Sequence, residues 1–414
     1  LMIIDIERYG SFGEGVSKNQ GKIIFVDGAL VGERVEVQII KQQSRYDFAK
    51  VKKILSKSDK RVQPICPYFN SCGGCQLMHA NYHEQLKIKE QIVNGNIAKY
   101  AKTMIDSDIQ KSVKQLNYRN HMTFSVKNNS LCLHKKSSNE LENISYCHIA
   151  NEMINSCIEP INNFMRNQQM DFDKVDIKAI QKQILITFYT KSAKKFDSNL
   201  LLSDLSNMYS YGIFVYNTKD KHLKHAYGIK NISYENSGLK CIVRPQSFLQ
   251  VNDDVAKILY DDVLGLIKDD IVVDCYSGRG ELSCRLAQKA KFVFGIEIDK
   301  SSHLDAVQIA QINEMRNIKF ILGDVDEEIT KLKDVDCVVI DPPRGGMKAR
   351  AANNIKALRP NKIIYISCAS NTLARDLNIF MNNYSIKYIK PYDMFPQTNN
   401  IETLVLLEKI NEKD

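Results

Sequence analysis

The sequence has no internal repeat, no low-complexity tract and no apolar stretch approaching the roughly 20 residues that a membrane-spanning helix requires. A helical membrane protein is therefore excluded, and no membrane partner is expected. Nothing at the amino end resembles a secretory signal, so the 11 cysteines are expected to be reduced, in the cytoplasm. Leu1 at the first position suggests that the natural start is missing. With 44% hydrophobic and 25% charged residues, disordered, collagen-like and fibrous classes are also excluded.

Length and charge indicate several domains and a basic protein. At roughly 150 residues per domain, 414 residues correspond to two or three domains, each long enough to bury a core. The net charge of +9 permits a polyanionic partner. Eight basic residues against two acidic ones lie between Lys41 and Arg61. This segment either contacts phosphates or forms a solvated face, and charge alone leaves both interpretations open.

Hydrophobic patterns divide the chain into three parts. Residues 1–57 alternate short apolar runs with glycine turns, which predicts a small β-barrel whose aromatic residues stack on RNA bases or pack in the core. Residues 58–240 combine an amphipathic helix at 85–100 with strand-like runs such as 121–126, as in an α+β domain. Residues 241–414 alternate strand and helix patterns, which predicts a parallel, doubly wound α/β sheet.

Three cysteines are closely spaced at Cys66, Cys72 and Cys75, with two glycines that let the backbone wrap around a bound group. In a reducing compartment such clustered thiols are metal ligands more often than core residues. A fourth ligand would come from another element, and the choices are Cys132, Cys147 and Cys157. Spacing does not distinguish zinc from an iron–sulfur cluster, because thiolates bind both.

A cofactor-binding loop is indicated after the first strand of the predicted sheet. Gly278 and Gly280 follow a strand and precede a helix, where glycines let a ligand approach the helix amino end. Glu297 ends the next strand, where a carboxylate can accept hydrogen bonds from ribose hydroxyls. This arrangement suits a nicotinamide dinucleotide or S-adenosylmethionine, and the missing third glycine favours S-adenosylmethionine. Asp324 is a candidate acceptor for the adenine amino group.

Two acids and a cysteine are candidates for chemistry at the same sheet edge. Asp341, in Asp-Pro-Pro-Arg-Gly-Gly, ends a strand beside the cofactor crevice, although it could instead cap a helix. Cys368 ends a buried strand before a helix, whose amino end favours a nucleophilic thiolate. Glu402 begins an apolar strand and is a candidate base. In isolation, Cys368 would more often be a core residue and Glu402 a surface charge.

These segments together resemble known families. The pattern Glu14-Gly15-Val16, Phe25-Val26 and Gly32-Glu33 is similar to the TRAM domain, an OB-like RNA-binding barrel. The segment from Cys66 to His79, with the segments around Asp341, Cys368 and Glu402, resembles the bacterial RNA uracil-C5 methyltransferases of the 23S ribosomal type.

The resemblance implies a class I methyltransferase sheet at 241–414, a TRAM barrel at 1–57, and a central domain at 58–240 that carries a [4Fe–4S] cluster. Cys368 would add to C6 of uracil, which makes C5 nucleophilic toward the methyl group of S-adenosylmethionine, and Glu402 would then remove the C5 proton. Asp341 would orient the base or polarise the uracil edge. The implied ligands are Cys66, Cys72, Cys75 and Cys147 for the cluster, and Gln250, Tyr276, Gly278, Glu281, Glu297, Asp324 and Asp341 for the cofactor.

Arg119, within Tyr118-Arg119-Asn120, matches a family element near the RNA, and it either contacts RNA or forms a structural salt bridge. The expected substrate is 23S ribosomal RNA rather than DNA, and the chain is expected to act as a monomer. Transfer RNA is the alternative substrate, ranked lower because the related transfer-RNA enzymes lack both the barrel and the cluster. The six remaining cysteines are expected to be reduced packing residues: Cys132, Cys157, Cys241, Cys275, Cys284 and Cys337.

Three departures from the family pattern keep open a third alternative, an RNA-binding protein with a degraded catalytic site. Glu281 stands where Asn or Thr is usual and adds negative charge beside a cationic cofactor. Ala369-Ser370 replaces Asn-Pro after the nucleophile, and Asn399-Asn400 replaces one or two histidines before the base. We expect these changes to affect rate more than reaction type.

Overall fold

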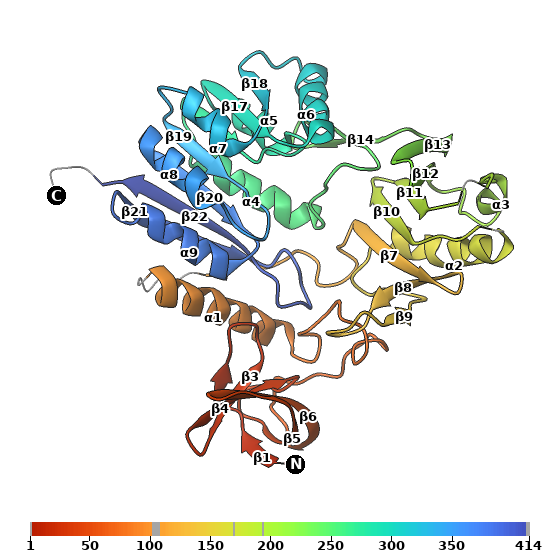
Figure 1. The fold of residues 1–414 in the computed structure, drawn as a ribbon, viewed down its shortest axis with the longest axis vertical. Coiled ribbons are helices and arrows are strands. Elements are labelled where there is room, and N and C mark those ends of the chain that lie inside the picture. The colour runs from red at the N-terminus through yellow and green to blue at the C-terminus, as the bar shows by residue number, and fades with distance from the viewer. Residues whose placement is uncertain (1, 102–107, 169, 193, 411–414) are drawn as a thin grey trace.

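The computed structural model describes residues 2–101, 108–168, 170–192 and 194–410. Figure 1 shows an amino-terminal barrel in red, a central sheet with its helices in yellow to green, and a helix-covered sheet in cyan to blue. This arrangement confirms the expected α/β class and the strand-built amino-terminal part. Within the described ranges, no helix is both long and apolar enough to cross a membrane.

The amino-terminal strands form a closed barrel. β1 (Met2–Asp5) and β2 (Arg8–Tyr9) follow one another along the chain and occupy the two ends of the strand order β1-β5-β6-β4-β3-β2, so the sheet returns on itself. Alternate residues such as Val35 and Val37 point into an apolar core. The other strands are β3 (Gly15–Asn19), β4 (Lys22–Asp27), β5 (Arg34–Gln42) and β6 (Tyr46–Ser56).

The central part is a seven-stranded sheet of order β13-β12-β11-β10-β7-β8-β9. Helix α2 (Glu152–Asn167) covers one face, because Ile154, Ile158 and Ile161 pack into the core with the apolar residues of the strands. The remaining elements are β7 (His121–Lys127), β8 (Ser130–His134), β9 (Leu141–Asn143), β10 (Lys174–Ile180), β11 (Gln183–Thr190), α3 (Asn199–Leu202), β12 (Ser210–Asn217) and β13 (His222–Gly228).

The carboxyl-terminal sheet has the order β18-β17-β16-β19-β20-β22-β21. Its first five strands are parallel, with helices between them, as the sequence pattern predicts. The elements are β16 (Ile271–Cys275), α5 (Glu281–Ala287), β17 (Phe292–Glu297), α6 (Lys300–Ile312), β18 (Ile318–Leu322), α7 (Val325–Glu328), a 3₁₀ turn (Ile329–Lys331), β19 (Cys337–Ile340), α8 (Ala349–Leu358), β20 (Lys362–Ser367) and α9 (Ser370–Phe380).

One strand, β22 (Glu402–Lys409), departs from the parallel sheet that the pattern predicted, whereas β21 (Tyr384–Tyr392) runs in the same direction as β20. β22 lies antiparallel between β20 and β21. The reason is the length of the connection, because only residues 393–401 join the two strands and a parallel crossover needs about a dozen or more. The short connection therefore brings Glu402 back to the sheet edge where β20 ends.

Elements outside the sheet pack closely on it. Helix α1 (Tyr82–Ala101) lies beside α9 and contributes to the core of the carboxyl-terminal sheet (Figure 1). The hairpin of β14 (Ile232–Asn236) and β15 (Leu239–Val243) packs on α5 and α6, so the expected division at residue 240 falls inside β15. Helix α4 (Asp253–Gly265) follows this hairpin.

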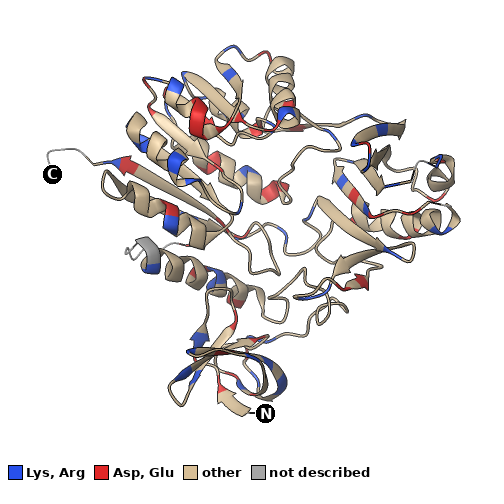
Figure 2. Ribbon diagram, viewed as in Figure 1, with Lys and Arg blue, Asp and Glu red and all other residues tan. Residues whose placement is uncertain are grey.

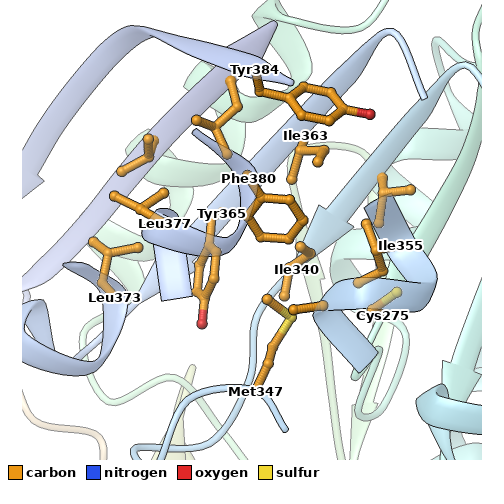
Figure 3. Close-up of a cluster of buried hydrophobic side chains, with 14 of the residues drawn as sticks. Cys275, Ile340, Met347, Ile355, Ile363, Tyr365, Leu373, Leu377, Phe380 and Tyr384 are labelled. Atoms are coloured by element: carbon orange, nitrogen blue, oxygen red, sulfur yellow. The ribbon is translucent and has the colours of Figure 1, made fainter. Parts of the chain in front are cut away.

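A buried core supports the strands that carry Asp341 and Cys368 (Figure 3). The Tyr365 hydroxyl of β20 donates to Asp376 Oδ2 at 2.8 Å, and the same oxygen accepts from the Met347 N–H at 2.9 Å, which ties α9 to the loop after Asp341. The six cysteines expected to be packing residues are all buried, whereas the five assigned to chemistry are partly exposed.

A buried ion pair joins α1 to the connection between β21 and β22. Lys89 and Asp393 contact each other with 0% of either side chain exposed. The Lys89 ammonium also donates to the Phe395 carbonyl at 2.9 Å, and the Tyr82 hydroxyl donates to Asp393 at 2.9 Å. Burial lowers the pKa of Lys89, and the negative charge of Asp393 opposes that shift.

We expect Lys89→Met to lower the free energy of unfolding by about 3–5 kcal/mol, because the change leaves Asp393 buried without its counter-charge. Urea denaturation measures the change. Lys87→Met, an exposed position on the same helix, is the matched control and should change stability little. Equal losses for the two variants would contradict a structural role for the ion pair.

Candidate active site

A cavity of about 470 Å³ opens where β16, β19 and β20 end and β22 begins. The carboxyl ends of parallel strands meet at one sheet edge, which is where such folds bind ligands. Eight of the predicted site residues line this cavity: Arg119, Gln250, Tyr276, Gly278, Glu281, Asp341, Cys368 and Glu402. Two others, Glu297 and Asp324, are not among its lining residues.

The loop after β16 has the shape that its glycines predict. Tyr276, Gly278 and Gly280 all have positive φ angles, of 65°, 53° and 77°. A side chain at Gly280 would place Cβ 2.6 Å from the Cβ of Ala306, so only glycine fits there. Glu297 Oε2 accepts from the Gly278 N–H at 2.8 Å. The carboxylate therefore fixes the loop, and its remaining lone pairs stay available for a ribose hydroxyl.

Asp324 lies apart from the cavity. It caps α7 by accepting from the Asp326 N–H at 3.1 Å, and it pairs with Lys348 at 2.9 Å. Its assignment to the adenine amino group stays a prediction.

Glu281 does not add a free negative charge to the cavity, contrary to expectation. Its carboxylate forms a buried ion pair with Arg279 and accepts from Asn236 Nδ2 at 2.9 Å and from the Tyr234 hydroxyl at 3.2 Å. The Tyr234 hydroxyl in turn accepts from Arg279 at 2.6 Å. Sequence pattern gave no sign of this pairing, because Arg279 occupies a variable position between the two glycines.

The candidate nucleophile and base face the same cavity. Burial raises the pKa of Asp341 to about 7, and burial together with the charge of Asp341 raises the pKa of Glu402 well above its usual range. Burial and the charge of Glu402 raise the pKa of Cys368 to about 11, whereas Arg344 lowers it. Burial and the nearby carboxylate therefore oppose, in the ligand-free protein, the thiolate that the amino end of α9 is expected to favour.

The connection between β21 and β22 is anchored by other parts of the chain. Gln397, buried and with a φ of 72°, accepts at its carbonyl from the N–H groups of Gln76 and Leu77, at 3.1 and 2.9 Å. The buried Tyr118 hydroxyl donates to the Pro396 carbonyl at 3.1 Å. These bonds hold the loop that delivers the candidate base.

Sequence reasoning missed several residues that position the site. Asn120 donates to the Gln250 carbonyl at 2.9 Å and to Asp253 at 2.7 Å, which fixes the segment that carries Gln250. Arg344 lies close enough to affect the pKa of Cys368. Their position in the sequence could have indicated both residues, since Asn120 follows Arg119 and Arg344 lies within the Asp341 motif.

A second cavity, of about 440 Å³, is lined by Cys66, Cys72, Cys75 and Cys147. Cys132 and Cys157 do not line it: Cys132 donates to Asn143 Oδ1 of β9 at 2.9 Å, and Cys157 donates to the Met153 carbonyl of α2 at 3.3 Å. Burial raises the pKa of the Cys75 thiol, and the charges of the other three cysteines raise it further. Within the described ranges, no three Cys, His, Asp or Glu side chains are arranged to hold a single metal ion.

Arg119 lines both cavities. Its Nε donates to the His121 carbonyl at 3.0 Å, and in the part of the chain that the structure describes it has no carboxylate partner. Among the described residues, Arg119 therefore forms no structural salt bridge, and its side chain is held by the bond to the His121 carbonyl.

The basic segment of the barrel divides into two groups. Arg61 pairs with the buried Glu33, and Lys60 pairs with Asp59. The other six side chains are exposed: Lys41, Arg45, Lys50, Lys52, Lys53 and Lys57. Figure 2 shows basic positions in blue on the strands of the barrel. These six side chains are accessible to phosphates.

Comparison with known proteins gives consistent matches over the whole chain. A family profile described as tRNA (Uracil-5-)-methyltransferase matches residues 81–410, and a TRAM domain profile matches residues 2–52. An uncharacterized RNA methyltransferase of Oceanobacillus iheyensis is 33% identical over 95% of this chain and 94% of its own. One from Caldanaerobacter subterraneus is 31% identical over 98% of both chains.

Among solved structures, the Pyrococcus abyssi tRNA (uracil-54, C5)-methyltransferase in complex with S-adenosyl-L-homocysteine has a TM-score of 0.80. It is 21% identical and covers 98% of this chain and 100% of its own. The likeness is one of fold, and it extends through the barrel.

The raised pKa of Cys368 predicts how its alkylation depends on pH. Between about pH 7 and about pH 9, the rate of modification by iodoacetamide should rise about tenfold per pH unit, because the thiolate fraction grows in that proportion below a pKa of about 11. Peptide mapping by mass spectrometry isolates Cys368 from the other cysteines.

Arg344→Met should slow this alkylation, because the arginine charge favours the thiolate. Lys348→Met removes a cation of the same loop that pairs with Asp324 and should leave the rate unchanged. A rate that stays flat over this pH range would contradict the argument from burial.

Proposed function

The chain belongs to the tRNA (uracil-5-)-methyltransferase family, as an S-adenosylmethionine-dependent RNA methyltransferase with a TRAM domain, and we propose that it methylates C5 of uridine in 23S ribosomal RNA. One observation carries the chemistry. Cys368, Glu402 and Asp341 line the same cavity as the glycine loop that follows β16.

The proposed reaction uses a covalent adduct with Cys368. Its thiolate adds to C6, and the electrons of the C5–C6 double bond move to give an enolate with a nucleophilic C5. C5 would attack the methyl group of S-adenosylmethionine, and the sulfur–methyl bond would break to release the neutral thioether S-adenosylhomocysteine. Glu402 then takes the proton from C5, the double bond reforms, and the thiolate leaves. The raised pKa of Glu402 suits this step, because its ionised form is a stronger base than an exposed carboxylate.

Cofactor and substrate contacts are proposed for the other cavity residues. Four residues that line the cavity come from the segments before and after β16: Gln250, Tyr276, Gly278 and Glu281. We assign these four residues, together with Glu297 and Asp324, to the binding of S-adenosylmethionine. Asp341 would orient the base or polarise the uracil edge. Arg119, without a carboxylate partner among the described residues, is assigned to the RNA.

Transfer RNA is the second candidate substrate. Its support is the likeness to the Pyrococcus abyssi tRNA enzyme over 98% of this chain. That likeness includes the barrel, so the barrel by itself does not separate ribosomal from transfer RNA. The preference for 23S ribosomal RNA thus rests on the cysteine segment. The labelling experiment below distinguishes the two substrates. We further propose that the protein acts in the cytoplasm, as a monomer with three domains at 1–57, 58–240 and 241–414.

We also propose that Cys66, Cys72, Cys75 and Cys147 bind a [4Fe–4S] cluster. Four unpaired thiols around one cavity are a suitable donor set, and they come from two separate segments. The reaction itself needs no electron transfer, so the group would either have a structural role or position the RNA. Its loop continues directly into Gln76 and Leu77, whose N–H groups hold Gln397.

The direct test incubates the purified protein with labelled S-adenosylmethionine and separate pools of unmodified 23S ribosomal RNA and transfer RNA. We expect label in 5-methyluridine of the ribosomal pool. Label in the transfer-RNA pool alone would move the assignment to the second candidate, and no label in either would support the degraded RNA-binding alternative.

Two variants in the same assay separate the roles of the cavity residues. Cys368→Ala should abolish both turnover and covalent RNA adducts, whereas Glu402→Gln should abolish turnover and let adducts accumulate, because the adduct then lacks a base. Denaturing gels measure the adduct. Wild-type activity in either variant would reject the role given to that residue.

Protein purified without oxygen should be brown and contain about four iron atoms per chain, a value set by the cluster type. Replacing Cys147 by Ser should release iron, and replacing the buried Cys157 by Ser is the control that should retain it. Stoichiometric zinc without iron in the wild-type protein would reject the cluster.

A further inference from the structure

The barrel loop between β2 and β3 holds an aromatic side chain out in solvent. Phe12 is 66% exposed. The backbone around it is nevertheless fixed, because the Phe12 N–H donates to Glu14 Oε2 at 2.8 Å and the Gly10 N–H donates to the Glu14 carbonyl at 2.8 Å. At Gly13, with a φ of 83°, a Cβ would lie 3.1 Å from Ile88 of α1, so the loop tip is seated against that helix.

The same loop is tied to the segment that delivers the candidate base. Asn399 Nδ2 donates to the Phe12 carbonyl at 2.9 Å. Asn399 lies three residues before Glu402, at a position where the family resemblance expects histidine. This hydrogen bond holds the backbone at Phe12, and with it the barrel loop, against the segment that leads to Glu402.

We propose that Phe12 is a stacking residue that receives an unpaired base of the substrate RNA beside the target uridine; this inference rests on the proposed function. A uridine that enters the cavity leaves its stack, so a neighbouring base loses a partner. The exposed ring of Phe12, on a loop bonded to the segment that leads to Glu402, would replace that partner by stacking on the neighbouring base. Binding would also cover the apolar ring that the free protein exposes.

Other aromatic residues of the barrel are less suited to this task. Phe25, Tyr46 and Phe48 lie on β4 and β6 and pack against one another, with ring centroids 5.5 to 5.8 Å apart. No ring among the described residues pairs with Phe12. Its face is therefore free for a base, and its backbone is already ordered.

The test measures binding of fluorescently labelled unmodified 23S ribosomal RNA and transfer RNA transcripts to the full-length protein by anisotropy. With the RNA that the wild type binds more tightly, Phe12→Ala should raise Kd about 5- to 150-fold, the range that corresponds to one stacked base. Phe12→Trp should stay close to the wild type. Tyr227→Ala, which removes an aromatic ring that is 45% exposed on β13, is the matched control and should not change Kd.

The salt dependence of Kd distinguishes two causes of weaker RNA binding by Phe12→Ala: the loss of a stacking contact, and a displacement of the barrel with its lysines. The slope of log Kd against log salt counts phosphate contacts, so Phe12→Ala should leave it unchanged, whereas Lys52→Gln on the barrel should lower it by about one. An unchanged Kd for Phe12→Ala would overturn the proposal. So would a raised Kd with a reduced slope, because the barrel lysines would then have moved from the RNA.

The binding assay is independent of methyl transfer. If the wild type binds RNA but does not methylate it, the proposed function fails, and the comparison of Phe12→Ala with Tyr227→Ala still decides the role of Phe12.

Discussion

The arrangement of the active cavity depends on the short connection between β21 and β22. Because it is too short for a crossover, it forces an antiparallel return and places Glu402 at the edge where Cys368 and Asp341 also end. The connection has little structure of its own, so other parts of the chain hold it. The buried Lys89–Asp393 pair fixes its start, and Gln397 in its middle is held by the segment that follows the cysteine loop.

Electrostatics in the cavity follow from burial as much as from residue type. Asp341 and Glu402 lie close together, and Arg344 is the cation that favours the ionised forms of both Glu402 and Cys368. With a pKa near 11, Cys368 is mostly protonated at neutral pH, so the proposed attack on C6 would require the bound substrate or cofactor to favour the thiolate. A cationic cofactor in the same cavity would act in that direction, because a nearby positive charge stabilises every anion there.

Periodicity and strand-end position were enough to predict much of this molecule. The parallel strands and the candidates at strand ends, such as Asp341 and Cys368, follow from them, since side chains at the carboxyl ends of parallel strands must meet at one edge. The roles of these residues, and the choice of Gln250 and Cys147, came from the family resemblance. Contacts that join distant segments were beyond such reasoning. Tyr118 and Pro396 are far apart in sequence, and no local pattern pairs them. The effect of burial on the pKa of Cys368 was beyond it as well, because burial is a property of the folded chain.

The contacts of the three departures from the family pattern are evidence on whether the protein is an RNA-binding homologue with a degraded catalytic site. A site that had lost its function would be free to lose the contacts around its altered residues. Here one residue of each departure is bonded to a distant segment: Glu281 accepts from Asn236 of β14 at 2.9 Å, the Ser370 hydroxyl accepts from Asn96 of α1 at 2.8 Å, and Asn399 donates to the Phe12 carbonyl at 2.9 Å. Each of these bonds joins a cavity segment to another part of the same fold. The changes therefore preserve the placement of the cavity residues, which argues for a working enzyme whose loops are held by different partners.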